Sequence, residues 1–141
     1  VGHNGSAVMR VVDDKKRILL GRQYRLPARR FLGELPAGRL DPGENSLQAA
    51  RRELKEETGY RARHWKKMVT FFPSPGYVEE TMTVYLATGL TAGEATPMDD
   101  ERIETGWFTA KDIETRIAKG SIVDAKTIVG MYAWKTFHRK G

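Results

Sequence analysis

Three glutamates in one short stretch, Glu53, Glu56 and Glu57, constrain this chain more than any other feature. On a helix of about 100° per residue, their carboxylates fall within an arc of about 100°. Like charges crowded in this way repel one another, so a solvated helix gains nothing from them. A divalent cation removes the repulsion, because Mg²⁺ and Mn²⁺ prefer hard oxygen ligands. The stretch therefore predicts a metal site that handles phosphate.

The helix that carries these glutamates has clear predicted ends. Asn45 or Ser46 is suited to its N-cap, and the helix is expected to run to about Thr58. Gly59 follows at the position where a left-handed residue commonly ends a helix. The stripe predicted to face the core, opposite the carboxylates, is Leu47, Ala50, Leu54 and Thr58.

Hydrophobic periodicity and turn residues place further elements on both sides of this helix. The predicted strands are residues 6–12 and 17–24 as a hairpin, 31–35, 65–72, 81–88 and 103–108. Two helices are expected over residues 111–119 and 124–138, and a long polar loop over residues 89–102. No repeat or low-complexity linker interrupts the chain. These elements predict one domain, residues 1–141, with a mixed α/β (α+β) sandwich.

Composition excludes several classes of protein. The chain has no cysteine, which rules out disulfides and thiolate zinc sites and fits a reducing compartment. No apolar run reaches the ~20 residues that span a bilayer, and no secretory pattern is present, so a cytoplasmic protein without a membrane partner is expected. Its 24 basic and 18 acidic residues give a net charge of +6. No motif that reads nucleic acid accompanies this charge, so an anionic small substrate is favoured.

The loop before the helix turns the metal prediction into a resemblance to a family. The pattern G-x₅-E-x₇-R-E-x-x-E-E-x-G is complete in this sequence, at Gly38, Glu44, Arg52, Glu53, Glu56, Glu57 and Gly59. It resembles the box of the Nudix hydrolases. The resemblance implies a Nudix-type α/β/α sandwich with a mixed sheet around a catalytic loop–helix–loop. It also implies metal-dependent hydrolysis of a nucleoside diphosphate linked to another group, with Mg²⁺ or Mn²⁺ as cofactor.

The resemblance also implies roles for individual residues. Glu53 and Glu57 resemble the principal metal ligands, and Glu56 resembles a further one. The Ala37 carbonyl is implied as an additional ligand. The residues implied to orient the carboxylates are Arg52 and Glu44, and Gly38 stands where the backbone must turn sharply.

The segments around the box resemble the ADP-ribose pyrophosphatases. They are Gln23-Tyr24-Arg25, Glu34-Leu35-Pro36-Ala37-Gly38, Ser74-Pro75-Gly76 and the acidic residues 99–101. This likeness implies that ADP-ribose, or a related nucleoside diphosphate sugar, is split into AMP and ribose 5-phosphate by a homodimer. An N-terminal β-region that helps bind adenine is usual in this subfamily, and most of it is absent before Gly38. Either the sequence is a fragment or the adenine pocket is built differently.

Further residues are expected to contact substrate or metal. Glu101 is the candidate general base or additional metal ligand, with Asp100 as its alternative. Arg25 is the candidate phosphate clamp. Glu34 and Glu79 are candidates to accept hydrogen bonds from the ribose hydroxyls, and Ser74 and Gly76 are candidates to line the terminal-ribose pocket. Tyr24 and Phe31 are candidates for stacking on adenine.

Five alternatives to this function stay open, and one of them is a nucleic-acid binder, which the net positive charge would suit. The enzyme could act on GDP-mannose, a dinucleotide or a damaged nucleoside triphosphate. A sensor could bind ADP-ribose or an NAD-derived ligand without cleaving it. A Nudix fold could have lost catalysis. Finally, the glutamate helix could be an ordinary surface helix with Arg51, Arg52 and Lys55 as ion-pair partners.

Overall fold

The computed structural model describes residues 4–25, 30–73, 80–92 and 104–140. Its strands are β1 (Asn4–Val11), β2 (Ile18–Arg25), β3 (Arg30–Glu34), β4 (Ala37–Arg39), β5 (Tyr60–Phe71), β6 (Glu80–Ala92) and β7 (Glu104–Phe108). Its helices are α1 (Ser46–Thr58), α2 (Ala110–Ala118) and α3 (Ala125–Lys140). Within these ranges no helix has both the length and the hydrophobicity that a membrane crossing requires.

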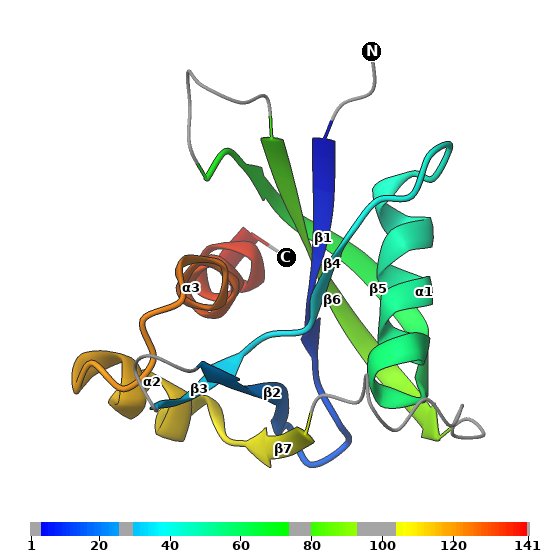
Figure 1. Cartoon of the computed structure of the whole chain (residues 1–141). Coiled ribbons are helices and arrows are strands. Elements are labelled where there is room, and N and C mark those ends of the chain that lie inside the picture. The colour runs from blue at the N-terminus through cyan, green and yellow to red at the C-terminus, as the bar shows by residue number, and fades with distance from the viewer. Residues whose placement is uncertain (1–3, 26–29, 74–79, 93–103, 141) are drawn as a thin grey trace.

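The strands form two sheets. The larger has the order β4-β1-β6-β5 and is mixed, because β1 pairs with β6 in parallel and with β4 antiparallel. The smaller has the order β3-β2-β7 and is antiparallel throughout. In Figure 1, α1 covers one face of the larger sheet and α3 the other, while α2 lies beside the smaller sheet. The predicted mixed α/β sandwich is confirmed.

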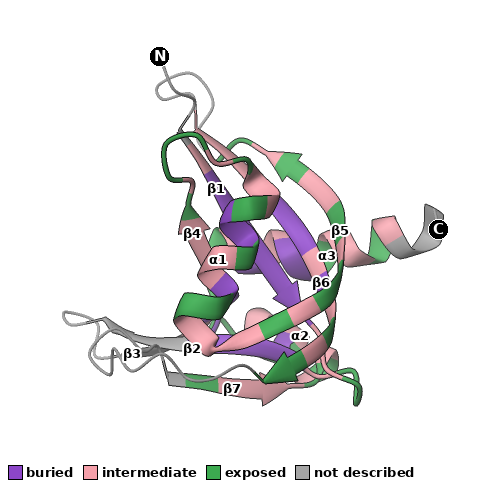
Figure 2. Cartoon of the chain, turned by 90° about the vertical axis from the view of Figure 1, so that its right-hand side faces the viewer, coloured by how far each residue is buried: buried purple, intermediate pink, exposed green. Residues whose placement is uncertain are grey.

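Strand β1 is the centre of the fold, and its side chains alternate between two cores. Ala7, Met9 and Val11 pack with α1, whereas Val8 packs with Met131 of α3. This alternation follows from the period of two along a strand, and both faces are buried because each is covered by a helix. Figure 2 shows the buried residues of β1 and β6 between the two helices.

The predicted hairpin of residues 6–12 and 17–24 is wrong. Strands β1 and β2 belong to different sheets and share only the isolated bridge between Val12 and Ile18. The two ladder positions beside β1 are taken by β4 and β6, so β2 pairs with β3 and β7 instead. Sequence patterns report where a strand is, but its partners depend on contacts far along the chain.

Three other expectations also differ from the structure. Strand β5 begins at Tyr60, directly after α1, five positions before the predicted start at Trp65. Strand β6 continues through Gly89, which has φ 70°, to Ala92, so the first part of the predicted polar loop is extended. The rest of that loop lies outside the described residues. Pro36-Ala37-Gly38 was expected only to end the strand of residues 31–35, but Ala37–Arg39 form a further short strand, β4, against β1.

A core substitution on α1 tests this packing. Leu54 is fully buried between α1 and the larger sheet. Leu54→Ala is expected to lower the free energy of unfolding by about 2–5 kcal/mol, because it removes apolar contacts and leaves a cavity. Urea unfolding measures this change. Val123→Ala is the control, since Val123 is 58% exposed and is expected to change stability by less than about 0.5 kcal/mol.

Candidate active site

Helix α1 presents the glutamates in a fixed register because both its ends are capped. The Asn45 side chain accepts a hydrogen bond from the Gln48 amide at 2.8 Å, and Gln48 Oε1 accepts one from the Asn45 amide at 2.9 Å. At the other end, Gly59 is left-handed with φ 78° and donates its N–H to the Lys55 carbonyl. Both caps were predicted, and together they confirm the bounds of this helix.

Arg52 joins the loop before α1 to the helix itself. Its Nε and Nη2 donate to the two carboxylate oxygens of Glu44 at 2.8 and 3.0 Å, and its Nη1 donates to Glu53 Oε1 at 2.8 Å. The hydrogen bonds from Arg52 hold the pKa of the Glu44 carboxyl below its usual range. The implied pairing of Arg52 with Glu44 is therefore present. Sequence analysis missed two further partners, the Arg39 carbonyl and the Asp41 carboxylate.

Glu53 lies directly against the short strand β4. A Cβ atom built on Gly38 would overlap Cγ and Cδ of Glu53, so no larger residue fits beside this side chain. Gly38 is thus required for close approach rather than for a special backbone angle. The preceding residue, Ala37, stands in the same strand, opposite Val8 of β1.

Glu57 and Glu53 form a pair of carboxyl groups. Burial, the charge of Glu53 and a hydrogen bond between the two side chains raise the pKa of Glu57 to about 8. The prediction that the acidic face points away from the core is confirmed for Glu56 but wrong for Glu53, whose side chain is only 17% exposed. The reason is helical geometry: Glu53 and Glu57 each lie three positions after a buried residue, Ala50 and Leu54, and so border the core face.

Glu56 differs from the other two glutamates. Its side chain is 59% exposed and accepts a 3.2 Å hydrogen bond from Arg52 Nη1. Among the described residues, no group of three or more Asp, Glu or His side chains is arranged to hold a metal ion. The assignment of Glu53, Glu56, Glu57 and the Ala37 carbonyl as ligands stays a prediction.

The residues present nevertheless fit a divalent cation. Glu53 and Glu57 are two partly buried carboxyls whose mutual repulsion contributes to the raised pKa of Glu57. A divalent cation between these carboxyls would remove the same repulsion, and carboxylate oxygens are the ligands that Mg²⁺ and Mn²⁺ prefer.

The Glu57 carboxyl gives the metal-free protein an expected pH dependence. The unfolded chain loses this proton near pH 4.5, whereas the folded chain keeps it to about pH 8. Between these values the folded state binds more protons, so the free energy of unfolding is expected to fall as pH rises from 4.5 to 8. Urea unfolding in EDTA across this window measures the slope. Glu57→Gln should flatten this slope, whereas Glu114→Gln on α2 should leave the slope unchanged. A slope in Glu57→Gln equal to that of the unsubstituted protein contradicts the assignment.

Glu34, the candidate for ribose binding, is buried beside α3 rather than displayed at the surface. Its Oε1 lies 3.7 Å from Nζ of Lys126, and the Lys126 ammonium is also 2.8 Å from Asp124 Oδ2. Lys126 opposes the rise in the pKa of Glu57 by its positive charge. Sequence analysis began this helix at Asp124, a recognisable helix-start residue, but did not single out Lys126.

The remaining predicted site residues fall in or beside segments outside the described residues. Glu101, its alternative Asp100, and the substrate candidates Ser74, Gly76 and Glu79 lie outside the described residues. For Arg25, Tyr24 and Phe31 only the backbone is described; Tyr24 pairs with Phe31 and Arg25 with Arg30 between β2 and β3.

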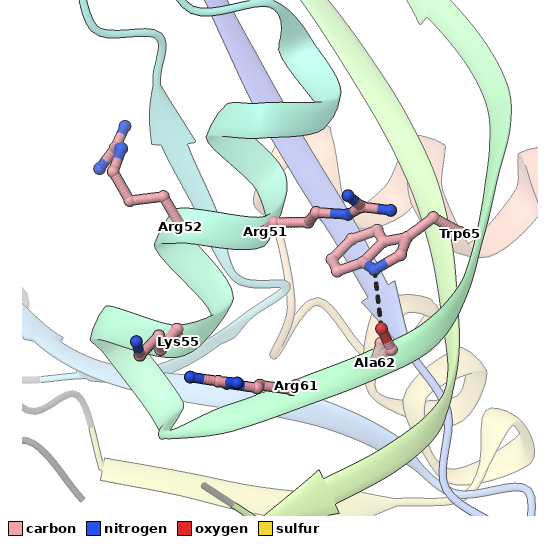
Figure 3. Close-up of a pocket in the computed structure, with 6 residues that line it drawn as sticks. All are labelled: Arg51, Arg52, Lys55, Arg61, Ala62 and Trp65. Atoms are coloured by element: carbon pink, nitrogen blue, oxygen red, sulfur yellow. Dashed lines mark hydrogen bonds between the residues drawn. The ribbon is translucent and has the colours of Figure 1, made fainter. Parts of the chain in front are cut away.

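A cationic pocket of about 350 Å³ lies between α1 and β5. It is lined by Arg51, Arg52, Lys55, Arg61, Ala62 and Trp65. Figure 3 shows Arg51 alongside the Trp65 ring, whose Nε1 donates to the Ala62 carbonyl, while Arg52 points away from both. Of the three partners in the surface-helix alternative, only Arg52 bonds to the glutamates within the described part of the chain.

Comparison with known proteins agrees with the fold and with the family that the box indicates. The NUDIX domain model matches residues 2–128. An ADP-ribose pyrophosphatase of Bacillus subtilis (strain 168) is 37% identical over 129 residues, covering 90% of this chain and 70% of the relative. An ADP-ribose pyrophosphatase of Mycobacterium tuberculosis (strain ATCC 25618 / H37Rv) is 38% identical over 136 residues, covering 94% of this chain and 66% of that relative.

A solved structure, described as an ADP compounds hydrolase, has the same fold. It superposes with a TM-score of 0.84 at 19% identity, covering 99% of this chain and 75% of that chain. The resemblance drawn from the box and its flanks is confirmed by these matches. The chain belongs to the NUDIX domain family.

Proposed function

We propose that this protein hydrolyses the pyrophosphate of ADP-ribose, or of a related nucleoside diphosphate sugar, to AMP and ribose 5-phosphate. The observation that carries the proposal is the Glu53–Glu57 carboxyl pair in the C-terminal half of the capped helix α1, where Glu53 bonds to Arg52 and lies against Gly38. The names of the relatives in Bacillus and Mycobacterium supply the substrate.

The residues divide the work as follows. Glu53 and Glu57 would hold Mg²⁺ or Mn²⁺, with Glu56, the Ala37 carbonyl and Glu101 as further candidate ligands. When bound, the metal supplies charge neutralisation for the pyrophosphate and lowers the pKa of a bound water. Arg52 keeps the Glu53 carboxylate oriented through its bond at 2.8 Å, and its own position is fixed by the two bonds to Glu44.

Hydrolysis adds one water across the pyrophosphate. The water oxygen forms a bond to one phosphorus while the bond from that phosphorus to the bridging oxygen breaks. Glu101 is the candidate to accept the proton of the water, and the bridging oxygen leaves with the other phosphate. Arg25 is the candidate clamp on the phosphate oxygens, because a guanidinium binds them in bidentate fashion.

Hydrolysis of ADP-ribose in ¹⁸O-labelled water with Mg²⁺ or Mn²⁺ tests the function. The expected products are AMP and ribose 5-phosphate, and the label reports which phosphorus is attacked. Faster turnover of GDP-mannose, a dinucleotide or an oxidised nucleoside triphosphate in the same panel would assign another substrate. Thermal stabilisation by ADP-ribose without product, with the metal present, would indicate a sensor instead.

The same proposal includes the setting of the protein. Residues 1–141 are proposed to act as a single Nudix domain in the cytoplasm, and the active form is proposed to be a homodimer. Light scattering coupled to size-exclusion chromatography measures the mass in solution, and a monomer with full activity would contradict the homodimer.

A further inference from the structure

Three polar residues at the start of α3 bond to one another, and two of them, Lys126 and Thr127, contact the segment leading into β4. We call Asp124, Lys126 and Thr127 the α3 clamp. The Thr127 hydroxyl donates to Asp124 Oδ2 at 2.7 Å and accepts a hydrogen bond from the Leu35 amide at 2.9 Å. Thr127 is completely buried, and Leu35 is almost so. A buried amide without a partner is costly, so the Thr127 hydroxyl is the required acceptor at this point.

Part of the segment that the clamp contacts lies outside the strand ladders. Leu35 and Pro36 connect β3 to β4 and lie in neither strand. Pro36 has no N–H, and its carbonyl accepts from the Met9 amide at 2.8 Å. The connection is therefore held from two sides, by β1 through Met9 and by α3 through Thr127.

The position of α3 behind this segment is itself fixed. A Cβ atom on Gly130 would overlap Cδ1 of Leu35, so the helix and the segment are in close contact. From β1, buried Arg10 donates to the carbonyls of Gly130 and Met131 at 3.3 and 3.2 Å. Because α3 is tied to β1 and lies directly against Leu35, a bond from α3 can set the position of the segment.

Lys126 connects the clamp to the residue before Leu35. Its ammonium lies 2.8 Å from Asp124 Oδ2 and 3.7 Å from Oε1 of Glu34, and its side chain is only 17% exposed. Shielding from water strengthens these contacts relative to surface ion pairs. The clamp thus contacts two consecutive residues, Glu34 and Leu35, immediately before the strand that lies against Glu53.

We propose that the α3 clamp is a positioning device for metal binding. Thr127 and Lys126 hold the segment from Glu34 to Gly38 in place, and thereby set the Ala37 carbonyl relative to Glu53 and Glu57. None of the clamp residues belongs to the Nudix box, and none needs to touch substrate. This inference rests on the proposed function, because it assumes that the carboxyl pair takes a divalent cation.

Removing the Thr127 hydroxyl tests the proposal at constant side-chain volume. Thr127→Val is expected to raise the dissociation constant for Mn²⁺, measured by EPR on the substrate-free protein, by about 10-fold, the size of effect that residues supporting metal ligands have. Thr127→Ser keeps the hydroxyl, so its dissociation constant for Mn²⁺ should lie within about 2-fold of that of the unsubstituted protein. Thr83→Val is the matched control, since Thr83 is also buried and its hydroxyl bonds only to Thr70 in the described structure.

A second variant keeps the test decisive if Thr127→Val is unstable. Lys126→Met retains the aliphatic stem and removes the charge beside Glu34. The same charge also acts on Glu57, so its loss alone would favour Mn²⁺. Binding that is about 10-fold weaker, and is largely recovered in Lys126→Arg, would therefore report the lost positioning. Lys135→Met is the control, because it breaks an exposed ion pair between Lys135, further along α3, and Glu114 of α2. It should bind Mn²⁺ as tightly as the unsubstituted protein does.

The results separate the two levels of the argument. If the unsubstituted protein binds Mn²⁺ and cleaves ADP-ribose, but Thr127→Val and Lys126→Met bind Mn²⁺ equally well, the clamp proposal is overturned and the function stands. Lower melting temperature with unchanged Mn²⁺ affinity has the same meaning, because it shows a purely structural role. If the unsubstituted protein binds no Mn²⁺, the proposed function fails, and the clamp proposal fails with it.

Discussion

Glu57→Gln is expected to lower kcat at least ~10²-fold, and Glu53→Gln to do the same, while both proteins remain folded. Glutamine has nearly the shape of glutamate but lacks its charge, so the pair loses the ability to balance a divalent cation. A 10²-fold loss corresponds to about 2.7 kcal/mol, within the several kcal/mol that metal-bound charge stabilisation contributes. Steady-state hydrolysis of ADP-ribose at saturating substrate measures this effect.

The Glu57 substitution is expected to separate activity from stability. In the metal-free protein, burial and the neighbouring Glu53 disfavour the ionised Glu57 carboxyl. Glu57→Gln removes this ionisable group, so the melting temperature in EDTA at pH 8 should be unchanged or raised, although turnover falls. Glu114→Gln on α2 is the control and should alter neither quantity. Unchanged turnover in both Glu53→Gln and Glu57→Gln would remove the metal assignment.

Gly38→Ala is expected to have an effect of similar size through geometry alone. The new methyl group would overlap Cγ and Cδ of Glu53, so either the Glu53 side chain rotates away or β4 separates from α1. In both cases the Glu53 carboxylate leaves its place beside Glu57. We expect at least a ~10²-fold loss of kcat and a destabilisation of about 1–3 kcal/mol from overpacking.

Gly5→Ala in β1 is the matched control for this substitution. A Cβ on Gly5 would meet Thr81 Oγ1 at 3.4 Å and the Leu40 methyl carbons at 3.5 Å, which are ordinary contacts. Its kcat should therefore stay within a small factor of the original. If Gly38→Ala also retained full activity, the close approach of Glu53 to β4 would have no part in catalysis.

The bounds of α1 and the pairing of Arg52 with Glu44 could be predicted from the sequence because the residues that determine them are close together in the chain. Asn45, Gly59 and the spacing of the glutamates all lie within one element, and the pairing of Arg52 with Glu44 spans a single loop and helix. The box could therefore be read without knowledge of the rest of the fold. The family assignment followed from the same residues.

The contacts that sequence analysis missed are those between distant segments. Thr127 bonds to Leu35 and Arg10 bonds to Gly130, pairs that nothing in their local patterns connects. The burial of Glu53 and Glu57 was missed for a related reason, since helical periodicity gives directions on α1 but not how far the neighbouring sheet extends around it. The hairpin error had the same origin, because the partners of β1 come from elsewhere in the chain.

The parallel pairing of β1 with β6 has a consequence for how this chain folds. Asn4 finds its partner at Glu80 and Val11 at Ala87, so the central strand is synthesised long before the strand that completes its ladder. Until then one edge of an apolar strand is open, and open edges invite pairing with other chains. Contacts of such long sequence separation also slow folding. The strand that organises both cores of the native protein is therefore the strand most exposed to aggregation while the chain is incomplete.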